Sequence, residues 1–252
     1  MKAPGRRALV LEHAPGEGPG RIAGALTAAG FHLDRRRLHR GDALPAALAS
    51  DELLVVMGGP MGVGDTHDAR YPFLAAELDL LAHAIAHDRA VLGICLGAQL
   101  LAAAAGAQVA RNRHHGRPQR EVGWASVTFA TGPHPELNGV PARAPMLHWH
   151  QDAAALPAGA IRLAWSERCP LQAFRLTRSG ARARQAGVQF HPEVEAATVS
   201  RWALADAAFV HGAGGMGAVA RLRHSTARQE ARSRTPARRL LANLIICLAG
   251  PG

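Results

Sequence analysis

Lysine and aromatic residues are scarce in this sequence. Lys2 is the only lysine, and aromatic residues make up 4% of the 252 positions. The formal net charge of +10 therefore comes almost entirely from arginine, whose planar guanidinium also binds phosphate. A surface for single-stranded nucleic acid would need aromatic side chains between the arginines, and the arginines here are not interleaved with them. We therefore favour a chain-wide bias toward arginine and alanine over phosphate recognition, and expect no specific nucleic-acid partner.

Long hydrophobic runs and paired cysteines are also missing. No apolar stretch approaches the roughly 18 residues of a membrane-spanning helix, so we expect no membrane partner. The N-terminus leads straight into the apolar run 8–11, without the hydrophobic region and cleavage site of a signal peptide. The three cysteines, at positions 95, 169 and 247, are odd in number and lack metal-ligand spacing. We expect a protein of the reducing cytoplasm, with no metal and no cofactor.

Apolar runs of strand length alternate with helical patterns over the first hundred residues. That alternation predicts β-α-β crossovers, and therefore an α/β fold with a mostly parallel central sheet and helices on both faces. Between residues 107 and 175 the predicted strands become short, which indicates a short antiparallel excursion. We expect strands at 7–13, 53–57, 90–94, 125–130, 146–149, 161–166, 171–175 and 186–190, and helices at 20–29, 72–87, 97–105, 196–210 and 236–248.

Cys95 stands where a predicted strand gives way to a predicted helix. The apolar run 90–92 leads into Gly-Ile-Cys-Leu-Gly at 93–97, and helix-forming residues follow. A serine at such a strand–turn–helix position is exposed at the top of a parallel sheet. A cysteine there would feel the positive end of the helix dipole, which favours the thiolate. Taken alone, the segment fits a nucleophile about as well as a small buried residue on a core strand.

A second segment could supply the base that a thiol nucleophile needs. Gln-Phe-His-Pro-Glu at 189–193 places His191 two residues before Glu193. On an extended backbone the two side chains share one face, so the carboxylate can orient the imidazole. Pro192 blocks a regular central ladder and predicts a strand end or a tight turn instead. An isolated His-Pro-Glu is more often a surface turn, so the other motifs decide its meaning.

Together with Gly-Gly-Pro at 58–60, these two motifs resemble a class I (triad-type) glutamine amidotransferase domain. Their order and spacing agree with that family, and the resemblance covers roughly residues 7–200. It implies a flavodoxin-like α/β fold of the class I glutamine amidotransferase type. Further segments resemble the stand-alone, GMP synthase-like branch of the family: Tyr-Pro at 71–72, Glu-Val-Gly-Trp at 121–124, His-Trp-His-Gln-Asp at 148–152 and Cys-Pro-Leu-Gln-Ala-Phe at 169–174.

The resemblance implies a role for each matching residue. Cys95 would attack the side-chain amide carbon of L-glutamine, His191 would move the proton, and Glu193 would orient the imidazole. Backbone N–H groups of Gly59 and Leu96 would stabilise the oxyanion. The two histidines of the 148–152 segment could also bind a metal, but the resemblance favours a loop scaffold. The remaining substrate contacts would fall on Gly58, Gln99, His148, Trp149 and His150.

The resemblance leaves three functions open. In the first, which we expect, Cys95 forms a thioester from L-glutamine and the ammonia goes to an unidentified acceptor, with a separate synthetase subunit as the partner. In the second, the protein cleaves a γ-glutamyl bond of a small peptide or amide, and water accepts the acyl group. In the third, the fold serves as a non-catalytic regulatory module. The intact Cys95, His191 and Glu193 favour an enzyme, and no nucleotide-binding Gly-x-x-x-x-Gly-Lys-Ser/Thr loop is present.

Residues 211–252 differ from the rest of the sequence in composition. Glycine is frequent in 211–217, which favours a linker within 211–235. The segment 221–239 carries seven arginines and one acidic residue, and an apolar run follows it. This part of the chain could be an amphipathic helical hairpin or a partner-binding arm. We expect a basic, helical extension that packs on the catalytic domain of residues 1–210, with 221–239 solvated.

Overall fold

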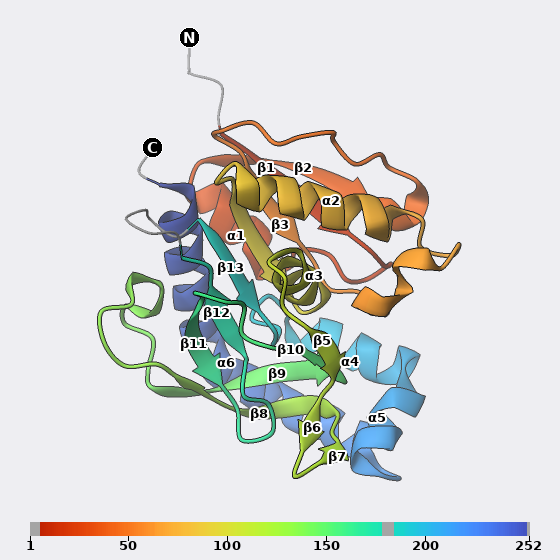
Figure 1. Cartoon of the computed structure of the whole chain (residues 1–252). Helices are drawn as coiled ribbons and strands as arrows, with labels where there is room; N and C mark the ends of the chain where they lie inside the picture. Colours follow the sequence, from red (N-terminus) through yellow and green to blue (C-terminus); the bar gives the residue numbers. More distant parts are fainter. Residues whose placement is uncertain (1–5, 178–183, 251–252) are drawn as a thin grey trace.

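The apolar runs of the sequence meet in the centre of one nine-stranded sheet (Figure 1). The computed structural model of the protein describes residues 6–177 and 184–250, and the sheet has the strand order β2-β1-β3-β4-β13-β12-β11-β8-β9. The first five strands in this order pair in parallel: β2 (Phe31–Arg37), β1 (Arg6–Glu12), β3 (Leu53–Val56), β4 (Ala90–Ile94) and β13 (Gln185–Val188). The last four join through antiparallel pairs: β12 (Ala173–Arg175), β11 (Ile161–Trp165), β8 (Glu121–Phe129) and β9 (Arg143–His150).

Helices cover both faces of this sheet. They are α1 (Arg21–Ala28), α2 (Phe73–Ala86), α3 (Leu96–Ala104), α4 (Ala196–Ala205), α5 (Ala207–Gly214) and α6 (Ala218–Ala249). Successive side chains of β1 point to opposite faces. Ala8 and Val10 belong to the core under α1 and α6, whereas Leu9 and Leu11 belong to the core under α2 and α3. The predicted α/β class, with a mostly parallel sheet and helices on both faces, is confirmed, and its antiparallel part comprises four strands.

Several short elements were not predicted, and β2 is the most extensive of them. Only Phe31 of β2 is buried, and two of its arginines form ion pairs: Arg35 with Glu12, and Arg36 with Asp34. Charged side chains are typical of an edge strand, and they hide the alternating apolar pattern that marks a strand in sequence. The other short elements are the pairs β5 (Val109–Arg111) with β10 (Asp152–Ala154) and β6 (Arg113–His114) with β7 (Arg117–Pro118), and 3-10 turns at Leu38–Arg40, Val63–His67 and Pro135–Leu137.

One long helix occupies the C-terminal region where a linker was expected. Residues 207–214 form α5, and α6 continues without interruption from Ala218 to Ala249. The predictions of a linker within 211–235 and of a helical hairpin are therefore wrong. Leu222, Thr226 and Glu230 are buried on one face of α6, at the spacing of helical turns. The seven arginines of 221–239 are all exposed on the remaining surface. The helix is therefore solvated on its outer face only.

None of the helices in the described ranges combines the length and hydropathy that a membrane crossing requires. The expected absence of a signal peptide depends on the first residues of the chain. Of these, residues 1–5, Lys2 included, lie outside the described ranges.

Candidate active site

Cys95 occupies a sharp turn between β4 and α3. Its φ of 50° and ψ of −104° lie in a region that L-residues rarely adopt, and its N–H donates to the carbonyl of Val188 at 2.8 Å. A Cβ on Gly93 would lie 2.4 Å from the carbonyl oxygen of Gly97, and one on Gly97 would lie 2.1 Å from that of Val56, so both positions require glycine. Strained backbone of this kind is concentrated at functional sites. The turn places the thiol at the carboxyl end of a parallel strand, where open α/β sheets bind their ligands.

His191 and Glu193 form a buried hydrogen-bonded pair in the turn after β13. Nδ1 of His191 lies 2.7 Å from Oε1 of Glu193, and the N–H of His191 donates to the carbonyl of Leu147 at 2.8 Å. Burial alone would lower the pKa of His191, but the charges of Glu193 and Cys95 outweigh it and raise the pKa well above its ordinary value. The other ring nitrogen, Nε2, is buried and has no hydrogen-bond partner among residues 6–177 and 184–250. It is therefore free to exchange a proton.

The loop after β3 lies against both Cys95 and His191. A Cβ on Gly58 would lie 3.3 Å from Cε1 of His191 and 3.6 Å from Cβ of Cys95, so the two side chains flank this glycine. One on Gly59 would lie 3.0 Å from Cδ2 of Leu96, the first residue of α3. The backbone N–H groups of Gly59 and Leu96 donate to no acceptor in the described part of the chain. The structure thus brings these two unpaired donors close to the thiol.

Gln99 and Trp149 approach the thiol in different ways. Nε2 of Gln99 donates to Oε1 of Gln189 at 3.1 Å and to the carbonyl of Asp152 at 3.0 Å. Nε2 of Gln189 in turn lies 3.5 Å from Sγ of Cys95, to which it donates. The carbonyl of Trp149, rather than its ring, accepts from the thiol at 3.7 Å. Gln189 lies within the sequence motif of His191, but the motif alone did not indicate that it would contact the sulfur.

His148 and His150 lie in a buried network centred on Glu121. Nε2 of His150 is 3.1 Å from Oε2 of Glu121, and Nδ1 of His148 is 3.6 Å from the same oxygen. Burial favours the neutral form of Glu121, but the hydrogen bond from His150 and the charges of both histidines outweigh it and lower its pKa to about 2. Burial is the main cause that lowers the pKa of His148 to about 4. The two side chains therefore contact Glu121, and their predicted contact with substrate stays a prediction.

Glu121, His148 and His150 also lie close enough together to bind one metal ion. Their ligand atoms lie within 4.8 Å of one another. Both oxygens of Glu121 already accept hydrogen bonds, however, from Oγ of Ser166 and from Nε2 of Gln172, each at 2.7 Å. In this structure the three residues belong to a hydrogen-bonded network that also includes Ser166 and Gln172, and the expected absence of a metal stays a prediction.

Three further polar side chains lie close to the Gly58 loop, and the sequence did not indicate them. Nδ1 of His13 is 3.0 Å from the carbonyl oxygen of Gly58, and its Nε2 is 2.9 Å from Glu77. Oε2 of Glu17 lies 3.1 Å from the position of a Gly58 Cβ. Burial raises the pKa of Glu17, partly offset by the charges of His191 and His13. His13 is the last residue of the first predicted strand and Glu17 follows it, so the carboxyl end of a parallel strand was the signal that could have marked them.

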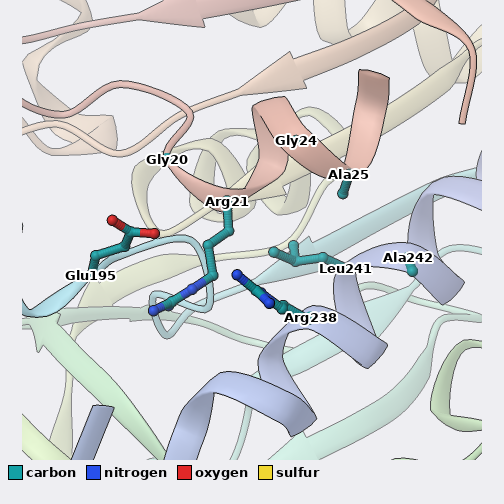
Figure 2. Close-up of a pocket in the computed structure, with 8 residues that line it drawn as sticks. All are labelled: Gly20, Arg21, Gly24, Ala25, Glu195, Arg238, Leu241 and Ala242. Atoms are coloured by element: carbon teal, nitrogen blue, oxygen red, sulfur yellow. The ribbon is translucent and has the colours of Figure 1, made fainter. Parts of the chain in front are cut away.

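Arg21 is hydrogen-bonded to the backbone of the turn that carries His191 and Glu193, and it also lines the hollow that Figure 2 shows. Its backbone N–H donates to the carbonyl of Glu193 at 2.9 Å, and its guanidinium donates to the carbonyls of Pro192 and Val194. The hollow has a volume of about 440 Å³, and Arg21 and Arg238 reach into it from α1 and α6 (Figure 2). Its lining residues are Gly20, Arg21, Gly24, Ala25, Glu195, Arg238, Leu241 and Ala242, so it is separate from Cys95.

The sequence was compared with those of known protein families. The class-I glutamine amidotransferase profile matches residues 22–208, most of the chain. The chain belongs to the class-I glutamine amidotransferase family. Members of this family hydrolyse the amide of glutamine, generally with a cysteine. The resemblance inferred from the sequence motifs is confirmed.

Individual relatives of this chain agree with the family. The glutamine amidotransferase-like protein YfeJ of Salmonella typhimurium is 34% identical over 146 residues, which are 57% of this chain and 59% of that protein. A glutamine-hydrolyzing GMP synthase of Thermomicrobium roseum is 36% identical over 142 residues, 56% of this chain and 23% of the synthase. The chain thus spans less than two thirds of each of these relatives. The crystal structure of a glutamine amidotransferase from Thermotoga maritima is 29% identical, has a TM-score of 0.78, and matches over 95% of this chain and 97% of its own.

Proposed function

We propose that this protein hydrolyses the side-chain amide of L-glutamine through a Cys95–His191–Glu193 triad. The observation that carries the proposal is the strained turn at Cys95, which holds a thiol beside a buried imidazole bound by a carboxylate. Because Glu193 binds Nδ1 of His191, the proton exchanged with the thiol is carried by Nε2. The raised pKa of His191 favours an imidazolium–thiolate pair, and the thiolate is the reactive form of cysteine.

The reaction begins with attack of the Cys95 thiolate on the amide carbon of glutamine. The carbonyl oxygen becomes an oxyanion, which the N–H groups of Gly59 and Leu96 stabilise. Such preorganised donors are worth about 2.7–4 kcal/mol each. His191 gives its proton to the leaving nitrogen, the C–N bond breaks, ammonia leaves, and a glutamyl thioester remains on Cys95. Water then gives a proton to His191 and attacks the thioester, which releases glutamate and restores the thiol.

The ammonia is consumed by a separate synthetase subunit in this proposal. The similarity to the Thermomicrobium roseum protein, a glutamine-hydrolyzing GMP synthase, supports a synthetase as the consumer. The protein would then show more glutamine hydrolysis when the partner and its acceptor are present.

Hydrolysis of a γ-glutamyl amide or peptide is the second candidate. It uses the same thioester and differs only in the leaving amine. The carboxylate of Glu17 favours it, because it lies beside Gly58 and has no hydrogen-bond or ion-pair partner within the described ranges. A cationic group of a larger leaving amine would pair with this carboxylate. A non-catalytic regulatory role is the least supported candidate, because it leaves the strained turn at Cys95 unexplained.

Product analysis separates these functions. L-Glutamine and neutral, acidic and cationic γ-glutamyl amides are supplied to the wild type, and ammonia and glutamate are both measured, with and without candidate synthetases. The main proposal predicts equal ammonia and glutamate from L-glutamine, and Cys95→Ala should lower this rate by about 10³-fold or more. Cys169→Ala is the matched control, because Cys169 is buried and hydrogen-bonded to Leu171 rather than to the site. A wild-type rate in Cys95→Ala would overturn the triad, and no turnover of any substrate would support the regulatory role.

A further inference from the structure

A fully buried ion pair lies behind the glycine loop of the active site. His13 follows β1, Glu77 lies on α2, and both side chains are 0% exposed. Nε2 of His13 is 2.9 and 3.0 Å from the two carboxylate oxygens of Glu77, and Nδ1 is 3.0 Å from the carbonyl oxygen of Gly58. Burying charged groups is costly unless they are well paired, so the position of this pair calls for a reason beyond packing.

Both nitrogens of the His13 ring face oxygen acceptors. A neutral imidazole has one N–H and could donate to only one of them, whereas an imidazolium donates to both. Burial lowers the pKa of His13, but the charge and hydrogen bond of Glu77, the Gly58 carbonyl and the charge of Glu17 outweigh it and raise the pKa. Glu77 on α2 and Glu17 in the loop after β1 are the charged groups that face the ring. The geometry thus favours a cationic His13, whose Nδ1–H donates to the carbonyl of Gly58.

We propose that His13 and Glu77 are positioning residues that orient the backbone N–H of Gly59 toward the oxyanion. The peptide bond between Gly58 and Gly59 is planar, and its C=O and N–H point in opposite directions. A donor that holds the carbonyl of Gly58 on one side therefore fixes the direction of the Gly59 N–H on the other. The inference rests on the proposed glutamine hydrolysis, in which that N–H binds the oxyanion.

The glycine loop needs such an anchor because of its own composition. Gly58 and Gly59 lack a Cβ and have the widest choice of backbone conformations, so the peptide between them could rotate. Close contacts require glycine at position 59, since a Cβ there would lie 2.9 Å from Cβ of His13 and 2.6 Å from Sδ of Met61. Small displacements of catalytic groups are costly, as about 1 Å can lower a rate by about 10²-fold. The hydrogen bond from His13 to Gly58 therefore makes rigid a loop that its two glycines would leave flexible.

Two double variants without charge at positions 13 and 77 separate the effect of the hydrogen bond to Gly58 from the effect of the ion pair. In His13→Asn with Glu77→Gln, the asparagine amide N–H can donate to the carbonyl of Gly58 as Nδ1 of His13 does. The glutamine amide at position 77 can in turn bind the asparagine side chain. In His13→Leu with Glu77→Met, the pair is equally uncharged but the donor is lost. We expect the Leu/Met variant to lose about 10- to 100-fold in kcat with KM changed less than about 3-fold, and the Asn/Gln variant to regain most of it. His87→Asn, at an exposed histidine after α2, is the control and should match the wild type.

Nitrogen NMR of labelled histidines gives a readout that does not depend on activity and stays usable if the Leu/Met variant fails to fold. We expect both nitrogens of His13 to be protonated near neutral pH, and kcat to fall as pH rises through the His13 pKa. That limb should vanish in the Asn/Gln variant, which has no titratable group there. A folded Leu/Met variant with wild-type kcat, or a neutral His13, would overturn the inference. If the wild type hydrolyses neither L-glutamine nor a γ-glutamyl amide while His13 is an imidazolium, the proposed function fails instead.

Discussion

Arg21, at the start of α1, forms a buried ion pair with Glu230, in the middle of α6. Both side chains are 5% exposed. The same guanidinium donates to the carbonyls of Pro192 and Val194, on either side of Glu193. The C-terminal helix is thereby connected to the turn that carries His191 and Glu193, although these parts lie far apart in the sequence.

Loss of this connection should destabilise the protein. Glu230→Gln removes the negative charge from a buried arginine, and breaking such a pair costs about 3 kcal/mol. Arg234→Gln is the control, because Arg234 pairs with the same carboxylate but is half exposed, and it should change stability little. Urea unfolding of both variants measures the difference. Equal stability of the two variants would show that the Arg21–Glu230 pair does not hold the turn.

Two helical glycines, Gly97 beside Cys95 and Gly24 within α1, should respond in opposite ways to substitution by alanine. Gly97→Ala would place a Cβ 2.1 Å from a backbone carbonyl, so we expect a loss of about 3 kcal/mol or more together with loss of activity. Gly24→Ala, within α1, meets nothing within 4 Å and should stabilise the protein by about 0.5–1 kcal/mol. Thermal unfolding of both variants tests this. A Gly97→Ala protein as stable as Gly24→Ala would mean that β4 and α3 are not packed as closely as described.

The Glu121 network predicts a pH dependence of stability. The pKa of His148 is lowered from 6.5 to about 4 in the folded protein, so the unfolded chain binds more protons between these pH values. The contribution of His148 is therefore fully present above pH 6.5 and is lost as pH falls toward 4, by roughly 3 kcal/mol. His148→Gln should remove this part of the decline, measured as unfolding free energy at pH 7 and pH 4.5. If the wild type and the variant decline in parallel, His148 is not buried in its neutral form.

The sequence was most informative where one short segment contains all the interacting residues. The turn at Cys95 lies between an apolar run and a helical run, and its glycines stand within two residues of the thiol. His191 and Glu193 are likewise neighbours in sequence, so the hydrogen bond between them was foreseeable. The alternation of strands and helices was enough to predict the sheet and its two covered faces.

Contacts between distant segments could not be foreseen in the same way. His13 meets Gly58 because β1 and β3 are adjacent in the sheet, and sequence order does not specify which strands are neighbours. The hydrophobic pattern defined a helix only from residue 236, although α6 begins at Ala218, because the buried face of α6 includes Thr226, Glu230 and Ser233, which are polar. Partners on other elements make their burial possible: Trp124 donates to Thr226, and Arg21 pairs with Glu230. The same polar residues look solvent-exposed in the sequence alone.

Labelling with an electrophilic glutamine analogue tests the central claim most directly. A γ-diazoketone analogue of L-glutamine should alkylate the thiolate, and peptide mass spectrometry then locates the adduct among the three cysteines. We predict one adduct per chain, on Cys95, that L-glutamine protects against and that His191→Ala slows by about 10²-fold or more. An adduct on Cys169 or Cys247, or labelling that continues in Cys95→Ala, would contradict the account.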